Sequence, residues 1–190
     1  MHENFRRLRH KLIAAAPPLR TFASYFDIVI NKPHGGSRVY MRNLFEPAAA
    51  TEVKERLAQL RPESERLWGT MNAAQAVAHC SGGLQLAMGE MRPPRMLVGS
   101  VIGWIVKPLV LADDKPMRRN SPTVKGLVIQ DQRDLGVEQE RLRALIDRFA
   151  AAGPRVCTTH PHSFFGRLTP EEWATLMYKH LDHHLRQFGV

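Results

Sequence analysis

The histidines at positions 180 and 184 are the residues of this sequence best placed for chemistry, because they lie four positions apart near the C-terminus. On an α-helix, side chains at positions i and i+4 lie on one face, one turn apart. The same face carries Trp173, Leu176 and Met177, so it is expected to face the core. Two imidazoles buried side by side lose their hydration and cannot both be protonated. A divalent metal binds neutral imidazole and resolves this conflict, so His180 and His184 predict a metal site.

A third ligand is expected from His79, in the segment Ala-Val-Ala-His-Cys at residues 76–80. It is placed in the middle of a predicted helix, whereas the histidines of the first 40 residues and of the loop at 160–162 are not. Asp182 and His183 are expected to point away from the core face. Three imidazoles leave a metal its double charge and an open coordination position, the arrangement of a catalytic Lewis acid. A plainer interpretation stays open, in which a His-x-x-x-His pair near a C-terminus is solvated charge favoured by the helix dipole.

The remaining candidate residues favour ordinary roles. The sequence has two cysteines, Cys80 and Cys157, which form no Cys-x-x-Cys pair and no disulfide framework, so a reducing, cytoplasmic setting is expected. Cys80 follows His79 directly and points about 100° away from it, as a small buried residue would. His160 and His162 could line the mouth of the site, but a loop role is favoured for them.

The helix that carries the histidine pair has the clearest start in the sequence. Thr169 is the predicted cap, Pro170 the first helical residue, and Glu172 completes a Thr-x-x-Glu capping box. We expect this helix to run to about Gln187.

The helix that carries His79 is predicted to be capped by Thr70 or Asn72 and to run to about Gly89. The Gly-Gly pair at residues 82–83 costs about 1 kcal/mol per glycine relative to alanine inside a helix. Such a cost indicates close backbone packing or a kink near His79.

Two further helices are predicted over roughly 47–60 and 134–152, and alternating β-branched residues are scarce, so the fold class is all-α. Between the second and third helices, residues 90–133 are expected to form a long irregular connection. Its apolar run, Met96 to Val106, is shorter than the roughly 20 residues that span a membrane, so we expect a buried or capping segment and no membrane partner. Membrane contact through this run stays open as the lesser alternative.

The first 40 residues are predicted to be a weakly ordered basic arm, ahead of a domain at 41–190. Residues 1–38 hold seven Lys/Arg and two acidic residues, so more than half of the net charge of +9 lies there. The alternatives are a leader upstream of a start at Met41 and a targeting presequence, and the arm and the leader together are favoured over the presequence. A basic stripe on the folded domain is lacking, so nucleic acid is not expected as a partner.

Two sequence blocks carry a resemblance to a known superfamily. Residues 68–79 read Trp-Gly-x-Met-Asn-Ala-Ala-Gln-Ala-x-Ala-His, and residues 178–190 read Tyr-x-His-Leu-Asp-His-His-Leu-x-Gln-Phe-Gly-Val. Together they resemble the DinB-like (damage-inducible, YfiT-type) metalloprotein superfamily, over about residues 42–190. The most similar branch is an uncharacterised domain family with the same Trp-Gly-x-Met and His-His-Leu-Arg-Gln-Phe-Gly blocks.

The resemblance implies an up-down-down-up four-helix bundle with a three-histidine metal site between helices. Matched motif to motif, it places the ligands at His79, His180 and His184 and leaves His183 outside. Zinc and nickel are the metals it implies. Characterised members of the superfamily include thiol S-transferases that use bacillithiol or mycothiol and a mycothiol-dependent isomerase, and dimers are common among them, which leaves open a homodimer.

The leading hypothesis is therefore a metal-dependent transferase, in which the metal on His79, His180 and His184 activates a low-molecular-weight thiol toward an electrophile. A metal-dependent hydrolase would use the same ligands on a water molecule. The alternative outside enzymes is a stress-associated binding module with a structural metal or none.

Overall fold

Helices make up the regular structure of this protein in the computed structural model, which describes residues 41–121 and 123–190. They are α3 (Pro47–Leu57), α4 (Ala73–Ala87), α5 (Leu97–Leu111), α6 (Leu135–Ala152) and α7 (Pro170–Gln187), with short 3-10 turns at Lys125–Leu127 and Gly153–Val156. The described residues contain no strand, only an isolated bridge between His162 and Gly166. The all-α prediction is confirmed for them, while the predicted basic arm at 1–40 lies outside the described residues.

The two helices that carry the histidines begin at capping boxes. In α7 the Thr169 side chain accepts a hydrogen bond from the Glu172 backbone N–H, and the Glu172 carboxylate accepts one from Thr169, as predicted. In α4 the cap is Asn72, paired with Gln75 in the same way. The structure thereby selects Asn72 over Thr70, because the Asn72 side chain accepts from the Gln75 N–H at 2.9 Å.

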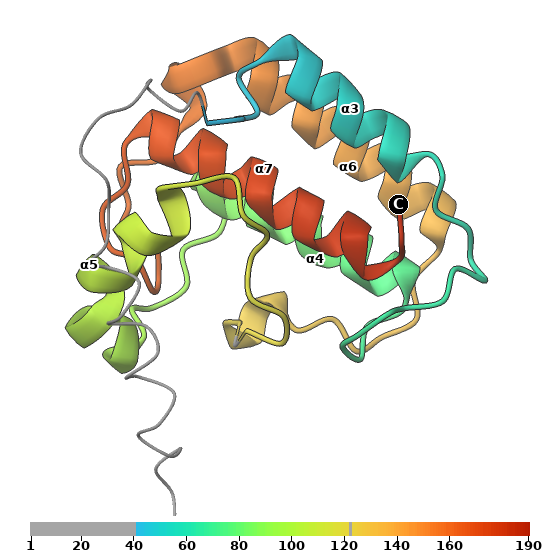
Figure 1. The fold of residues 1–190 in the computed structure, drawn as a ribbon, viewed down its shortest axis with the longest axis horizontal. Coiled ribbons are helices and arrows are strands. Elements are labelled where there is room, and N and C mark those ends of the chain that lie inside the picture. Colours follow the sequence, from blue (N-terminus) through green and yellow to red (C-terminus); the bar gives the residue numbers. More distant parts are fainter. Residues whose placement is uncertain (1–40, 122) are drawn as a thin grey trace, which may run out of the picture. The chain divides into compact units, whose positions relative to one another are not determined.

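Four of the helices share one core. Helix α4 packs against α6 and α7, and α3 packs against the same two (Figure 1). Helices α3 and α7 run in one direction and α4 and α6 in the other. Trp173, Phe149 and Ile146 are fully buried between them. Fully burying an aliphatic or phenyl side chain of this size contributes about 1.5–3 kcal/mol.

The connection between α4 and α6 differs from the prediction of an irregular segment at 90–133, because it contains α5. The apolar run Met96 to Val106 was expected to be a buried or capping segment, and the expectation of burial is wrong: within α5 only Gly99 and Gly103 are buried. The reason is the glycine spacing of four, which puts both glycines against the Phe164 backbone and turns the larger side chains outward. None of the helices among the described residues is long and apolar enough to cross a membrane.

Helix α7 is buried on more sides than its sequence pattern indicates. Asp182, expected to point away from the core, is 6% exposed and pairs with Arg56 of α3 at 2.8 Å and with Arg186 at 2.7 Å. The Lys179 ammonium, also buried, donates to the carbonyls of Val110 and Asp113 at 2.6 Å each. The end of α5 is therefore tied to the helix that carries His180.

Candidate metal centre

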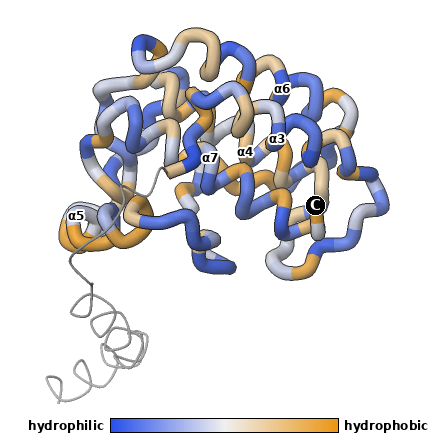
Figure 2. The backbone as a smooth tube through the Cα atoms, turned by 45° about the horizontal axis from the view of Figure 1, so that its top comes forward, coloured by the Kyte–Doolittle hydropathy of each residue, from blue (hydrophilic) through white to orange (hydrophobic). Residues whose placement is uncertain are grey.

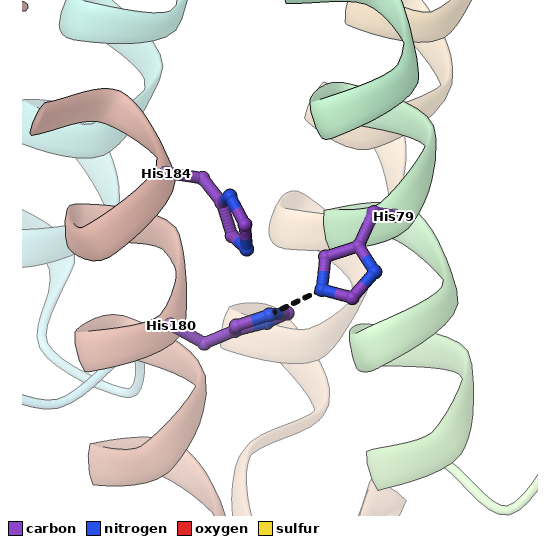
Figure 3. Close-up of side chains that lie close together, drawn as sticks. All are labelled: His79, His180 and His184. Atoms are coloured by element: carbon purple, nitrogen blue, oxygen red, sulfur yellow. Dashed lines mark hydrogen bonds between the residues drawn. The ribbon is translucent and has the colours of Figure 1, made fainter. Parts of the chain in front are cut away.

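The packing of α4 on α7 brings three histidines together (Figure 3). His79 comes from the middle of α4, and His180 and His184 come from successive turns of α7. One ring nitrogen from each lies within 4.8 Å of those of the other two. Within the described part of the chain this is the one such group of His, Cys, Asp or Glu side chains, and it contains no carboxylate. The three histidines predicted from the sequence therefore converge.

His79 is oriented by a backbone carbonyl. Its Nδ1 lies 2.8 Å from the carbonyl oxygen of Leu127, in the short turn of the connection. Because a carbonyl can only accept, Nδ1 carries the proton, and the neutral ring keeps its lone pair on Nε2. That Nε2 faces His180 Nε2 at 2.9 Å.

His184 is oriented by Gln187 in a similar way. Its Nδ1 lies 2.9 Å from Gln187 Oε1. The amide of Gln187 is itself held, because its Nε2 donates to the Trp68 carbonyl at 2.7 Å and the side chain is 2% exposed. The oxygen of the amide therefore faces the ring, and His184 Nδ1–H donates to it. Metal-binding histidines commonly have their other ring nitrogen held by such an outer partner.

His180 approaches the α4 backbone at the Gly-Gly pair. A Cβ atom on Gly83 would lie 2.9 Å from His180 Nδ1, and one on Gly82 would lie 2.5 Å from Leu127 Cδ2. Leu127 is the residue whose carbonyl holds His79. The close packing predicted for residues 82–83 is thus confirmed, and both glycines serve the histidine cluster.

The electrostatics of the cluster favour uncharged rings. Burial lowers the pKa of His79, although the hydrogen bond to Leu127 acts in the opposite direction. Burial, and then the neighbouring imidazoles, hold the pKa of His180 well below its usual value. Burial and the proximity of His79 lower the pKa of His184 to about 3. At neutral pH the rings are uncharged, which is the form that coordinates metals.

The other histidines near the site have different roles. His183 is outside the cluster, with its ring centroid 5.6 Å from that of Trp68 and 5.1 Å from that of His184. His162 Nδ1 accepts from the backbone N–H groups of Phe164 and Phe165, which confirms the predicted loop role.

Neither cysteine belongs to the group of residues that could hold a metal. Cys80 is buried in the core, as expected, and burial raises the pKa of its thiol. Cys157 is half-buried, and its pKa is raised to about 11 by burial and by the nearby Glu171.

Two contributors to the site were not singled out from the sequence, the Leu127 carbonyl and Gln187, and neither was a neighbouring residue, Arg119. Gln187 had a detectable signal, because it lies three residues after His184 and therefore on the same helix face. The Arg119 guanidinium lies 4.1 Å from the Trp68 ring centroid, on the side of the cluster where His183 packs. No local sequence pattern predicts that the Leu127 carbonyl contacts His79 or that Arg119 lies over Trp68.

Comparison with known families supplies one match. Residues 42–189 match the family described as "Protein of unknown function (DUF1569)", and the chain belongs to that family. Searches of curated proteins and of solved structures returned no match to this chain.

Proposed function

We propose that this member of the DUF1569 family is a metal-dependent enzyme whose divalent metal, zinc or nickel, is held by His79, His180 and His184 and activates a low-molecular-weight thiol for transfer to an electrophile. The observation that supports it is the convergence of three imidazoles, two of which have their Nδ1 atoms engaged so that Nε2 is left with a lone pair.

The donor set fits such a metal. Metal–nitrogen distances of about 2.0–2.1 Å put tetrahedral donor atoms about 3.4 Å apart. The observed separations include 2.9 Å between the Nε2 atoms of His79 and His180, and none of the chosen donor atoms is farther than 4.8 Å from another. A divalent cation bound there would act as a Lewis acid and lower the pKa of a thiol or water molecule.

The arrangement of helices supports placement in the DinB-like superfamily. Helices α3, α4, α6 and α7 follow one another in the directions up, down, down, up around a shared core. We propose that they form the four-helix bundle of that superfamily, with α5 as an addition between the second and third bundle helices.

The proposed thiol comes from a separate molecule, because neither cysteine of the chain belongs to the histidine cluster where it would bind the metal. Cys80 is buried in the core and outside the histidine cluster, and the Cys157 sulfur lies 3.9 Å from the Pro170 carbonyl at the start of α7. Arg119 is exposed, and its guanidinium lies over the ring of Trp68, which neighbours His183, the residue before His184. Thiol cofactors that carry carboxylates would be attracted to it.

In the proposed enzyme, groups outside the cluster hold the metal-binding histidines in place. The Leu127 carbonyl and Gln187 fix the ring orientations of His79 and His184, so that the donor atoms are arranged before a ligand arrives. The glycine at position 83 allows His180 to approach.

The first test is elemental analysis of purified protein. We expect wild type to carry zinc or nickel, and His79→Ala and His180→Ala to lose it. His183→Ala is the matched control, because this histidine neighbours the cluster without belonging to it. Equal metal content in all four proteins would contradict the ligand assignment.

The reaction is tested separately on metal-loaded wild type. We expect a thiol to be consumed together with a model electrophile such as an epoxide or an aryl halide. Hydrolysis of an ester or amide without thiol consumption would favour the hydrolase, and inactivity in both assays with metal bound would reject an enzyme of either kind.

A further inference from the structure

Helix α5 turns a continuous apolar face to solvent. Eight large hydrophobic side chains of the described residues are exposed and five of them lie on this helix, so the exposure is concentrated there. These five are Leu97, Val98, Val101, Trp104 and Ile105. At 100° per residue they fall on one side of the helix, together with the exposed Pro108 and without a charged residue. Figure 2 shows α5 as a strongly hydrophobic stretch at the margin of the helical core.

The opposite face of α5 holds the helix in this orientation. A Cβ on Gly103 would lie 2.0 Å from the Phe164 carbonyl oxygen, and one on Gly99 would lie 2.5 Å from the Phe164 Cα. Only glycines allow this backbone contact. Lys107, at the edge of the buried face, pairs with Glu172 of α7 at 2.8 Å. The apolar side chains are therefore held outward by contacts that turning the helix would break.

The surroundings of α5 are basic. Three exposed arginines border it, two before the helix and one in the neighbouring loop: Arg92, Arg95 and Arg167. Among the nearby acidic groups, Glu172 and Asp113 form ion pairs with lysines, while Asp114 beyond the helix end is exposed. An apolar face with a basic border complements an anionic surface.

We propose that α5 is an interfacial helix that docks this protein on an anionic lipid surface. Trp104 and its apolar neighbours would enter the boundary between headgroups and acyl chains, and the bordering arginines would contact lipid phosphates. A helix of 15 residues is about 22 Å long, too short to span the bilayer, so the protein lies on the membrane.

A lipid surface explains the charge better than a second copy of the chain does. A symmetric contact through α5 would bring two basic borders together, whereas anionic headgroups neutralise them. The sequence-based expectation of no membrane partner rested on the length of the run at Met96 to Val106, which is too short to span a bilayer. A helix that lies in the interface needs no such length, and the exposure of this run leaves its apolar side chains free for that contact. The inference depends on α5 alone and is independent of the metal.

The test uses the full chain and vesicles of phosphatidylcholine, with or without about one quarter phosphatidylglycerol. Trp104 is the most exposed of the three tryptophans and serves as a built-in reporter, because it is 71% exposed, whereas Trp68 is half-buried and Trp173 is 0% exposed. We expect co-sedimentation with the anionic vesicles, weakened by salt, and a blue shift of the Trp104 fluorescence. The double variant Val98→Glu/Val101→Glu keeps the reporter and should lower partitioning about tenfold or more. Val137→Glu, at a 63% exposed position on α6, is the matched control and should bind as wild type does.

Several results would overturn the proposal. One is the absence of vesicle binding, and another is equal binding to neutral vesicles. A third is binding that survives the α5 double variant but is lost when Arg6, Arg7 and Arg9 are replaced by Gln, which would assign the contact to the N-terminal segment. A fourth is a dimer in solution that the α5 double variant dissociates while vesicles leave Trp104 unchanged, which would make a second copy the occupant.

Discussion

The ring orientations of His79 and His184 depend on two groups outside the cluster. Leu127 supplies a backbone carbonyl to His79, and Gln187 supplies a side-chain oxygen to His184. The carbonyl of Leu127 cannot be removed by substitution, but the amide of Gln187 can. Gln187 is therefore the residue that best tests whether ring orientation governs metal binding.

Replacing Gln187 with Leu should lower metal affinity about 10–100-fold, the usual effect of losing an outer-sphere partner. The reason is that His184 loses the acceptor that keeps its proton on Nδ1. The measurement is competition with a chelator of known affinity, monitored by metal content. Gln85→Leu is the control, because Gln85 lies on α4 and bonds to Arg141 and Glu90, outside the cluster. Equal affinities for wild type and the Gln187 variant would show that orientation of His184 does not matter.

At the scale of elements, the site depends on how closely α4 and α7 approach. The glycine at position 83 faces the His180 ring, and the one at 82 faces Leu127. A glycine in a helix interior is destabilising by itself, so its presence here reflects the space that the facing side chain needs.

The substitution Gly83→Ala should weaken metal binding while keeping the protein folded. Alanine favours helix formation by about 1 kcal/mol, but its Cβ would lie 2.9 Å from His180 Nδ1, which forces the ring or the helix to shift. Affinity is measured by chelator competition and helix content by circular dichroism. Gly126→Ala is the control, because its Cβ would meet only Met91 Cε at 3.8 Å, an ordinary contact. A Gly83 variant that binds metal as wild type does would mean that the ring has room to move.

At the scale of the whole molecule, a half-buried histidine outside the cluster, His162, couples stability to pH. Burial, and then the charge of Arg95, lower the pKa of His162 to about 4. The geometry agrees with this direction, because Nδ1 accepts from two backbone N–H groups and protonating it would break both hydrogen bonds. In an unfolded chain the same ring titrates near its usual value of about 6.5.

Between about pH 6.5 and about pH 4, the unfolded state binds more protons at His162 than the folded state does, so the free energy of unfolding falls as pH falls. Replacing His162 with Asn keeps an acceptor for the loop and removes the titration. We therefore expect a shallower loss of stability in the variant, measured as urea unfolding in the presence of a chelator at several pH values. His160→Asn, at an exposed position, should keep the wild-type slope. Identical slopes for wild type and the His162 variant would contradict the account.

The sequence alone determined features that arise within a few residues of one another. The start of α7 follows from Thr169, Pro170 and Glu172, and the shared face of His180 and His184 follows from their spacing of four. Helical periodicity and capping are local, so they can be predicted without knowing the neighbours. The all-α class and the placement of His79 in the middle of a helix followed from the same kind of pattern.

Only the tertiary structure decided which faces are covered. The apolar run at Met96 to Val106 resembles a core segment, yet its glycines pack on the Phe164 backbone and its larger side chains face solvent. Asp182 reads as a surface residue, yet it is buried against Arg56 of α3. Whether a side chain is buried depends on packing against elements that are distant in the sequence. A local pattern shows which residues share a face of a helix, but not which other element packs on that face or how closely it approaches.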